Sequence, residues 1–283
     1  MHRRQYLAAL GAAGAGALAG CAGVLGGGDS GSVDLTLDPG PSQDDDLPAD
    51  QDAGDGYPPA FDEHPPEQAV DEGWFEPYDV AGRDVMNADE TVTVTLAPID
   101  VAYYWYARGE ARFVDARPRY NYDRAHVYGA VSSPYNTALD GSVGDWATAD
   151  RIVCYCRCPH HQSSIRAAEL QSAGFERVYV IDEGFEPWLK DRNYPVVGSQ
   201  VESNLEPVPI EGRTDAGDAG ATAWARHAPT GQTEATKIGD DGTYGMVLRF
   251  ADVDADSEIT VETPSYEVTG RLADLAAGVV TGP

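Results

Sequence analysis

Between residues 91 and 197, short apolar segments with the pattern of strands alternate with segments that have the pattern of helices. The expected strands are residues 91–96, 112–115, 152–156 and 177–181. The expected helices are residues 98–108, residues 183–191, and a segment that starts at Ser163 or Ser164, runs through Ala173 and is ended by Gly174. Strands that alternate with helices form a largely parallel sheet covered on both faces. The sequence therefore predicts an α/β domain over residues 91–197.

Four short motifs occur in a fixed order inside this domain. They are FVDARP at residues 113–118, YDRAHVYGAV at 122–131, GFERVYV at 174–180 and EGFEPW at 183–188. In this order they resemble the rhodanese (sulfurtransferase) domain family, with Ala125 where that family usually has glycine. The resemblance implies a rhodanese-like parallel sheet with helices on both faces, and sulfur-transfer chemistry that needs no cofactor.

The resemblance also implies a nucleophilic cysteine in a loop between a strand and the following helix. Unpaired N–H groups of such a loop, together with the helix dipole, stabilise a thiolate and lower its pKa. The thiolate attacks a sulfane sulfur, holds it as a persulfide and passes it to an acceptor. We therefore expect a sulfurtransferase with a donor such as thiosulfate and with a thiol or cyanide as acceptor.

Three cysteines compete for this role. Cys158 lies six residues before Ser164 and nine residues before Ala167, which is the spacing of the resembling family. Choosing Cys156 lengthens the loop by two residues, and choosing Cys154 places the thiol inside the expected strand. We therefore predict Cys158 as the catalytic residue and Cys156 as an alternative nucleophile or resolving thiol. Cys154 is expected to be a buried small apolar residue.

The residues after Cys158 are predicted to form the substrate-binding loop. They are Pro159, His160, His161, Gln162, Ser163 and Ser164. This loop departs from the family pattern, because Pro159 removes an N–H donor, no glycine is present and no arginine closes the loop. His160 and His161 offer positive charge or hydrogen bonds to an anion; the other interpretation is surface histidines beside a tight turn.

Three further residues have supporting roles in the resemblance: Asp115, Arg117 and His126. Asp115 and Arg117 follow the end of an expected strand, near the active loop. We expect this pair to organise the neighbouring backbone, and we expect His126 to be a structural histidine rather than a general base.

Other chemistries of the loop are less favoured. A phosphatase or arsenate reductase needs an arginine that closes on an oxyanion, and no arginine follows Cys158 before Arg166. A zinc site would use Cys156, Cys158, His160 and His161, but these ligands lie within six residues and have no second cluster, so we predict no metal. A Cys156–Cys158 disulfide would close a strained ring, and a transient pair is more plausible than a structural one.

Residues 1–20 have the pattern of an export signal. Paired arginines precede an uncharged Ala/Gly/Leu run, as in a twin-arginine signal peptide, and residues 18–21 resemble a lipobox that ends at Cys21. The run is too rich in Gly and Ala to predict a membrane-spanning helix. We therefore expect Cys21 to be lipid-modified and the protein to be anchored at the extracellular face of the cell membrane.

The strongly acidic residues 21–90 are expected to form a disordered tether, because they hold too little apolar surface to offset the entropy of ordering. The aromatic residues Trp74, Phe75 and Tyr78 are the exception, and we expect this stretch to pack on the domain that follows.

A second domain is expected after a linker at residues 198–209. Residues 210–270 have the pattern of a small all-β domain, and residues 271–283 that of a short helix or tail. The expected strands are residues 221–227, 242–250 and 258–263, with a hairpin turn at residues 240–242. The segments TGQ, DGTY and ITVETPSYE resemble a carboxypeptidase regulatory-like (transthyretin-like) β-sandwich. Such modules stabilise or bind, and we expect no catalytic group in this one.

The chain of 283 residues carries 47 Asp and Glu against 19 Lys and Arg, which gives a formal net charge of −28. A surface of this charge repels nucleic acid and anionic lipid. It is familiar from halophilic proteins, because salt screens the self-repulsion. The expected partners are therefore a small sulfur donor and a thiol acceptor, in addition to the membrane reached by the lipid anchor. The alternative is a non-catalytic rhodanese-like module that senses or binds an anion or a metal.

Overall fold

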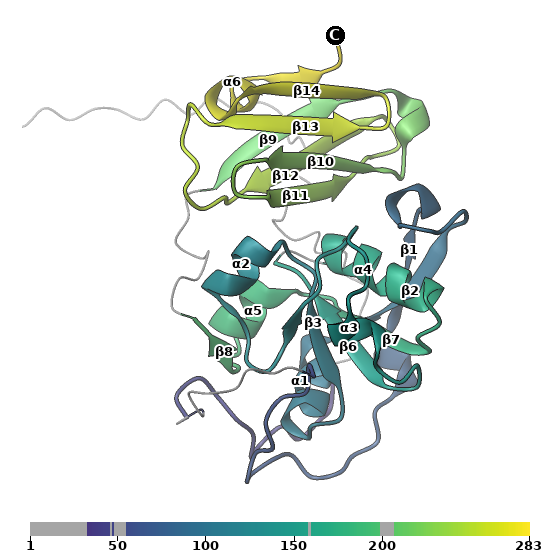
Figure 1. Ribbon diagram of the computed structural model, residues 1–283, viewed down its shortest axis with the longest axis vertical. Helices are drawn as coiled ribbons and strands as arrows, with labels where there is room; N and C mark the ends of the chain where they lie inside the picture. Colours follow the sequence, from purple (N-terminus) through teal and green to yellow (C-terminus); the bar gives the residue numbers. More distant parts are fainter. Residues whose placement is uncertain (1–32, 46, 48–54, 158–159, 199–206) are drawn as a thin grey trace, which may run out of the picture.

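The computed structural model describes residues 33–45, 47, 55–157, 160–198 and 207–283 (Figure 1). These residues form an α/β domain and, after it, a domain built from two β-sheets. None of the helices in these ranges is long and apolar enough to cross a membrane. The predicted signal peptide, lipobox and Cys21 lie outside the described residues.

The α/β domain is built on a six-stranded sheet with the order β1-β2-β7-β6-β3-β5. Its strands are β1 (Glu76–Val80), β2 (Val92–Ala97), β3 (Arg112–Asp115), β5 (Val131–Ser132), β6 (Arg151–Tyr155) and β7 (Arg177–Ile181). All neighbouring strands run parallel except β1, which is antiparallel to β2 at the edge. The predicted parallel sheet is confirmed. A separate two-stranded ladder joins β4 (His126–Val127) to β8 (Val196–Val197).

Helices cover both faces of this sheet. They are α1 (Ile99–Ala107), α2 (Arg119–Arg124), α3 (Gly141–Gly144), α4 (His161–Ser172) and α5 (Phe185–Lys190). The first core packs α1 and α5 on one face around Tyr106, Phe113 and Trp188, and we call it the α1 core. The second packs α4 on the other face through Ile165 and Leu170, and we call it the α4 core. Helices on both faces explain why the middle strands are apolar throughout.

Helix α4 begins earlier than the sequence predicts. It starts at His161, after His160 in a left-handed conformation with φ of 36°, so Ser163 and Ser164 lie in its first turn and do not cap it. The cap at Ser163 or Ser164 was predicted from the preference of helix starts for hydroxyl residues. In the structure, the Ser164 N–H donates to the carbonyl oxygen of His160 at 2.8 Å, so Ser164 is already inside the helix. The predicted end is confirmed, because α4 stops at Ser172 and Gly174 follows with φ of +99°.

The expected disordered tether differs from the structure in its described part. Alternate apolar residues Val33, Leu35 and Leu37 pack against the α1 core, and residues 76–80 form β1 of the main sheet. Phe75 packs as expected, stacked on Trp105 with ring centroids 5.9 Å apart. The average composition of the segment hides these apolar residues, which bury part of their surface against the domain.

The second domain consists of a four-stranded sheet, β11-β10-β13-β14, and a three-stranded sheet, β12-β9-β15. Its elements are β9 (Val208–Arg213), β10 (Thr222–His227), β11 (Gln232–Lys237), β12 (Thr243–Leu248), β13 (Glu258–Thr263), β14 (Tyr266–Arg271), α6 (Leu272–Ala276) and β15 (Val279–Thr281). The two sheets share one apolar core, with Val261 from one sheet and Ile210 and Met246 from the other. This arrangement agrees with the predicted small β-sandwich. The described residues also contain three short 3-10 helices, two before the main sheet domain's β2 and one in the second domain: Glu72–Trp74, Gly82–Asp84 and Ala216–Asp218.

One local prediction for this domain is wrong. The turn at residues 240–242 does not close a hairpin, because it joins β11 to β12 and these strands belong to different sheets. For residues 271–283, the predicted short helix is present as α6, and β15 after it pairs in parallel with β9. A turn sequence specifies a chain reversal but not which strands pair beyond it.

The β-sandwich lies across the end of the α/β domain at which α2 and α4 lie, with β11 facing that domain (Figure 1). Trp224 of β10 and Ala235 of β11 belong to the α4 core, so the two domains share buried apolar surface. The Trp224 ring stacks on Tyr135 with centroids 4.9 Å apart and an interplanar angle of 5°. Gln162 Nε2 donates to the carbonyl oxygen of Thr233 at 2.9 Å. The interface therefore has an apolar centre and polar contacts directly at the start of α4.

Candidate active site

Cys156 lies directly after β6, and its sulfur lies at the N-terminal end of α4. Ser163 Oγ donates to Cys156 Sγ at 3.3 Å, and the backbone N–H groups of Gln162 and Ser163 also hydrogen-bond to this sulfur. These donors come from the first turn of a 12-residue helix, where backbone N–H groups have no partner inside the helix. The geometry is a sulfur cradle that favours negative charge on Cys156.

Burial opposes this cradle. The Cys156 side chain is 2% exposed, and loss of hydration raises the pKa of its thiol to about 11, although the hydrogen bonds from Ser163 and Gln162 lower it. The sulfur is therefore a thiol at neutral pH in this closed arrangement. A thiolate forms more readily if solvent or a cation reaches the sulfur.

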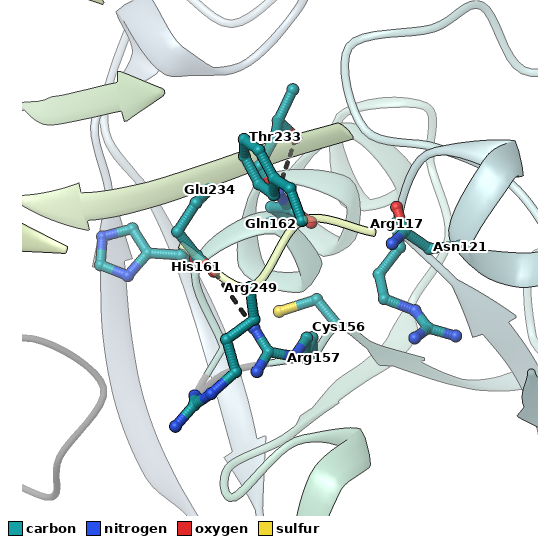
Figure 2. A pocket seen from close by; sticks show the side chains of 10 residues that line it. Arg117, Asn121, Cys156, Arg157, His161, Gln162, Thr233, Glu234 and Arg249 are labelled. Carbon is teal, nitrogen blue, oxygen red and sulfur yellow. Dashed lines mark hydrogen bonds and ion pairs between the residues drawn. The ribbon is translucent and has the colours of Figure 1, made fainter. Parts of the chain in front are cut away.

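A small pocket surrounds this sulfur (Figure 2). We call it the Cys156 pocket, and its lining residues are Arg117, Asn121, Cys156, Arg157, His161, Gln162, Thr233, Glu234, Arg249 and Phe250. The space left in it is about 20 Å3, which is enough for one water-sized molecule. Three of these residues are arginines, and one is a carboxylate.

The predicted nucleophile Cys158 and its neighbour Pro159 lie outside the described residues. The third cysteine, Cys154, is fully buried in the α4 core, and burial raises the pKa of its thiol far above the ordinary value. Its position matches the prediction of a small apolar residue in the strand.

The predicted loop histidines have different environments. His160 Nδ1 lies 2.9 Å from Asp182 Oδ1, and its ring lies edge-on to Tyr78 with centroids 4.6 Å apart. His161 lines the Cys156 pocket, but its Nε2 is buried and has no hydrogen-bond partner among the described residues. Burial lowers the pKa of His161 to about 3, so the ring is uncharged at neutral pH. Any contribution of His161 to an anion is then a hydrogen bond and not a charge.

The polar residues of the first turn of α4 divide into two groups. Ser163 contacts Cys156, as described, whereas the buried Ser164 Oγ has no hydrogen-bond partner among the described residues. Gln162 donates to both the carbonyl oxygen and the hydroxyl of Thr233, at 2.9 and 2.8 Å. This glutamine therefore attaches the predicted substrate loop to the β-sandwich.

Asp115 and Arg117 form a fully buried ion pair behind the pocket. Arg117 Nη2 donates to Asp115 Oδ2 at 2.6 Å and to the carbonyl oxygen of Ala125 at 2.6 Å. The backbone N–H of Arg117 donates to Asp115 Oδ1 at 3.0 Å. The pair thus holds two backbone segments together, as the sequence predicts, and Arg117 also lines the pocket.

His126 and Arg166 lie away from the sulfur. The half-buried His126 ring stacks on Tyr122 at 3.8 Å, its Nδ1 hydrogen-bonds to the carbonyl oxygen of Tyr122, and burial lowers its pKa. These contacts agree with a structural role. Arg166 bonds to Ser133 Oγ and to Glu169 Oε2. It is thereby engaged on another side of α4, and nothing in its contacts indicates an oxyanion-closing arginine.

Four pocket residues come from the β-sandwich, and the sequence analysis missed all of them: Thr233, Glu234, Arg249 and Phe250. They lie more than 70 residues after Cys156 in the chain. The only signal in the sequence is that Arg249 is one of few basic residues in an acidic chain. Residues so far apart meet only because the two domains pack together.

The described residues contain no group of three or more His, Cys, Asp or Glu side chains that could hold a metal ion. Cys158 of the possible zinc set lies outside these residues. The polar residues that line the Cys156 pocket are three arginines, two amides, a threonine, a buried histidine and one carboxylate, and this set suits an anion better than a metal cation.

Residues 100–191 match the family model described as a rhodanese-like domain. The solution structure of the rhodanese-like domain of an Anabaena protein is 25% identical to this chain, covers 38% of it and 82% of its own length, and has a TM-score of 0.34. A crystal structure of a Bacillus halodurans protein is 25% identical, covers 36% of this chain and 76% of its own, and has a TM-score of 0.33.

Proposed function

Because residues 100–191 form a rhodanese-like domain, we propose that this protein is a sulfurtransferase in which Cys156 carries the transferred sulfur as a persulfide. The observation that carries this proposal is the position of the Cys156 sulfur. It lies at the end of a central parallel strand, beside the first turn of α4, and receives hydrogen bonds from Ser163 Oγ and from the N–H groups of Gln162 and Ser163. The same donors would stabilise the charge of the outer sulfur of a persulfide.

The reaction has two displacement steps. The Cys156 thiolate attacks the outer sulfur of thiosulfate, the S–S bond of thiosulfate breaks, and sulfite leaves with the bonding electron pair. A thiolate or cyanide then attacks the outer sulfur of the persulfide, so that the sulfur leaves on the acceptor and the Cys156 thiolate is regenerated. No external oxidant or reductant is needed.

The start of α4 at His161 changes the spacing argument that decides between Cys156 and Cys158 as the nucleophile. The spacing argument for Cys158 counts back from Ser164 as the first helical residue, but Ser164 lies in the first turn, three residues after the helix begins. The count therefore no longer favours Cys158 over Cys156. The assignment of Cys158 as the nucleophile stays a prediction from spacing. As a thiol close to Cys156 in the chain, Cys158 also suits the role of an acceptor for the persulfide sulfur.

The raised pKa gives the reaction a pH dependence. With a thiol pKa of about 11, only about one molecule in ten thousand carries the Cys156 thiolate at pH 7. The thiolate fraction, and with it the rate of sulfur loading, should rise about tenfold per pH unit between pH 7 and 9. A loading rate that levels off below pH 8 would mean that the reacting thiol has an ordinary or lowered pKa.

The alternative is a module that binds an anion without turnover. The closed pocket and the protonated thiol favour this alternative, because both slow nucleophilic attack. The two functions differ in whether the protein becomes covalently modified by a sulfur donor.

Intact-mass measurement after incubation with thiosulfate tests the proposal. We expect the parent protein to gain the mass of one sulfur atom, and the Cys156→Ser variant to gain none. Cys154→Ser and Cys158→Ser are matched controls with the same substitution, and both should still gain the sulfur. A gain that survives Cys156→Ser but is lost in Cys158→Ser would return the role to Cys158. No gain in any protein would exclude the sulfurtransferase and leave the binding module.

We further propose that the protein is exported and lipid-anchored through Cys21, as the pattern of residues 1–21 supports. Sulfur transfer would then take place at the extracellular face of the membrane.

A further inference from the structure

The Cys156 pocket has an unusual charge for this chain. The whole sequence has 47 acidic and 19 basic residues, yet three arginines and one carboxylate line this small pocket. Carboxylates otherwise dominate the chain, so a cluster of arginines beside a thiol points to a bound anion.

Two of the three arginines are committed to neighbouring carboxylates. Arg117 is held in the buried pair with Asp115, and Arg157 Nη1 lies 3.7 Å from Glu234 Oε2. Arg157 Nη2 also lies 3.6 Å from Glu186 Oε2. The charges of these two arginines are therefore already balanced by protein groups.

Arg249 differs from both. It follows the last residue of β12, is half-buried, and lines the pocket from the β-sandwich side (Figure 2). Within the described part of the chain, its guanidinium forms no ion pair and no hydrogen bond. Its charge acts on Glu186 only from a distance, where it helps to lower the pKa of that carboxyl group. Glu186 is itself paired with Lys190 at 2.5 Å.

The domain interface holds Arg249 in this position. Its strand belongs to the β-sandwich, which is fixed to the α/β domain by the Trp224–Tyr135 stack and by the hydrogen bonds of Gln162 to Thr233. The contact between Gln162 and Thr233 lies beside the Cys156 sulfur, since both residues line the same pocket.

We propose that Arg249 of the β-sandwich binds the anionic end of the sulfur donor, so that the active site is completed by both domains. This inference rests on the proposed sulfurtransferase function. It supplies the arginine that the loop itself lacks, since no arginine lies between Cys158 and Arg166. It also favours a small oxyanion of sulfur, such as thiosulfate, as the donor, because a guanidinium binds the oxygen atoms of such an anion.

The test compares the thiosulfate concentration that gives half-maximal sulfur loading, measured by intact mass. We expect Arg249→Gln to raise this thiosulfate concentration about tenfold or more, because the variant loses one hydrogen bond between charged groups. The final extent of sulfur loading should stay complete. Arg249→Lys keeps the charge and should recover most of the affinity. Arg213→Gln removes an exposed arginine from β9 of the same domain and should leave the value unchanged. Equal thermal midpoints would show that all variants are folded.

Two results would overturn the inference. If Arg249→Gln loads at the same thiosulfate concentration as the parent and Arg213→Gln, Arg249 does not bind the donor, although the sulfurtransferase function would stand. If no protein loads sulfur, the proposed function fails, and calorimetric binding of sulfate decides about the pocket. Sulfate carries no transferable sulfur, so binding that is weakened only in Arg249→Gln supports the anion site. Sulfate binding that is absent, or equal in all variants, rejects it.

Discussion

At the scale of single residues, the site depends on opposing effects at Cys156. Its sulfur receives hydrogen bonds that favour a thiolate, but its burial favours the thiol and raises the pKa to about 11. The effect of burial is the larger one. Nearby, the pair of Asp115 and Arg117 is equally buried, but there each charge has a direct partner. A buried ionisable group keeps its charge when an opposite charge lies beside it, whereas a buried group without such a partner favours its neutral form.

The buried pair gives a stability prediction. We expect Asp115→Asn to lower the free energy of unfolding by about 3–5 kcal/mol, because Arg117 would keep its charge in the interior with no carboxylate beside it. Denaturant unfolding measures this change. Asp123→Asn is the matched control, because it breaks the exposed pair with Arg119 and should cost less than about 1 kcal/mol. Similar losses in both variants would show that Asp115 and Arg117 do not depend on each other.

At the scale of elements, the carboxyl ends of the parallel strands and the starts of the helices meet at one edge of the sheet. Cys156 follows β6 at this edge, and the Cys156 pocket lies beside the start of α4. Glu183, between β7 and α5, receives a hydrogen bond of 2.9 Å from the N–H of Ile99 at the start of α1. One carboxylate therefore joins two elements that are 84 residues apart in the chain.

Glu183 predicts how stability depends on pH at this junction. Burial raises its pKa from 4.5 to about 7, so its contribution to stability is fully present below pH 4.5 and is lost as the pH rises through 7. Glu183→Gln keeps an acceptor for the Ile99 N–H and stays neutral. We expect the variant to match the parent at pH 4.5 and to be more stable than the parent at pH 8. Denaturant unfolding at both pH values checks this, and a variant that is less stable than the parent at pH 8 would contradict it.

At the scale of the whole molecule, the packing of the two domains decides what can reach the active site. Trp224 is 6% exposed and lies in the shared α4 core, so the β-sandwich is held by apolar burial as well as by hydrogen bonds. The acidic surface predicts that salt stabilises the molecule, through screening of self-repulsion, and this halophilic character stays a prediction.

Removing the Trp224 side chain tests the cover over Cys156. Trp224→Ala leaves a cavity beside Tyr135 and should loosen the interface, which exposes the sulfur to solvent and lowers its pKa. In a Cys158→Ser background at pH 8, we therefore expect faster alkylation of Cys156 by iodoacetamide, by about tenfold or more. Trp74→Ala is the control, because Trp74 packs against the α1 core and not at this interface. Equal alkylation rates in the two variants would mean that the β-sandwich does not shield Cys156.

The sequence by itself determined the α/β domain, most of its strands and the loop that holds the candidate thiols. Apolar strands such as residues 112–115 and 177–181 are specified by their own residues, and so is the end of α4 at Gly174. The Asp115–Arg117 pair could be expected because its partners are two residues apart. These features depend on short-range patterns, which a single sequence displays directly.

Only the tertiary structure decided the rest of the site. The start of α4 depends on the left-handed turn at His160, a conformation that histidine adopts more often than most residues but still rarely, so its presence alone does not predict the turn. The protonated state of Cys156 depends on burial, to which a distant domain contributes. Arg249 reaches the pocket only because β10 and β11 pack on the α/β domain, and the contacts that hold them there join residues far apart in the chain. Packing between domains brings such residues together without leaving a local pattern in the sequence.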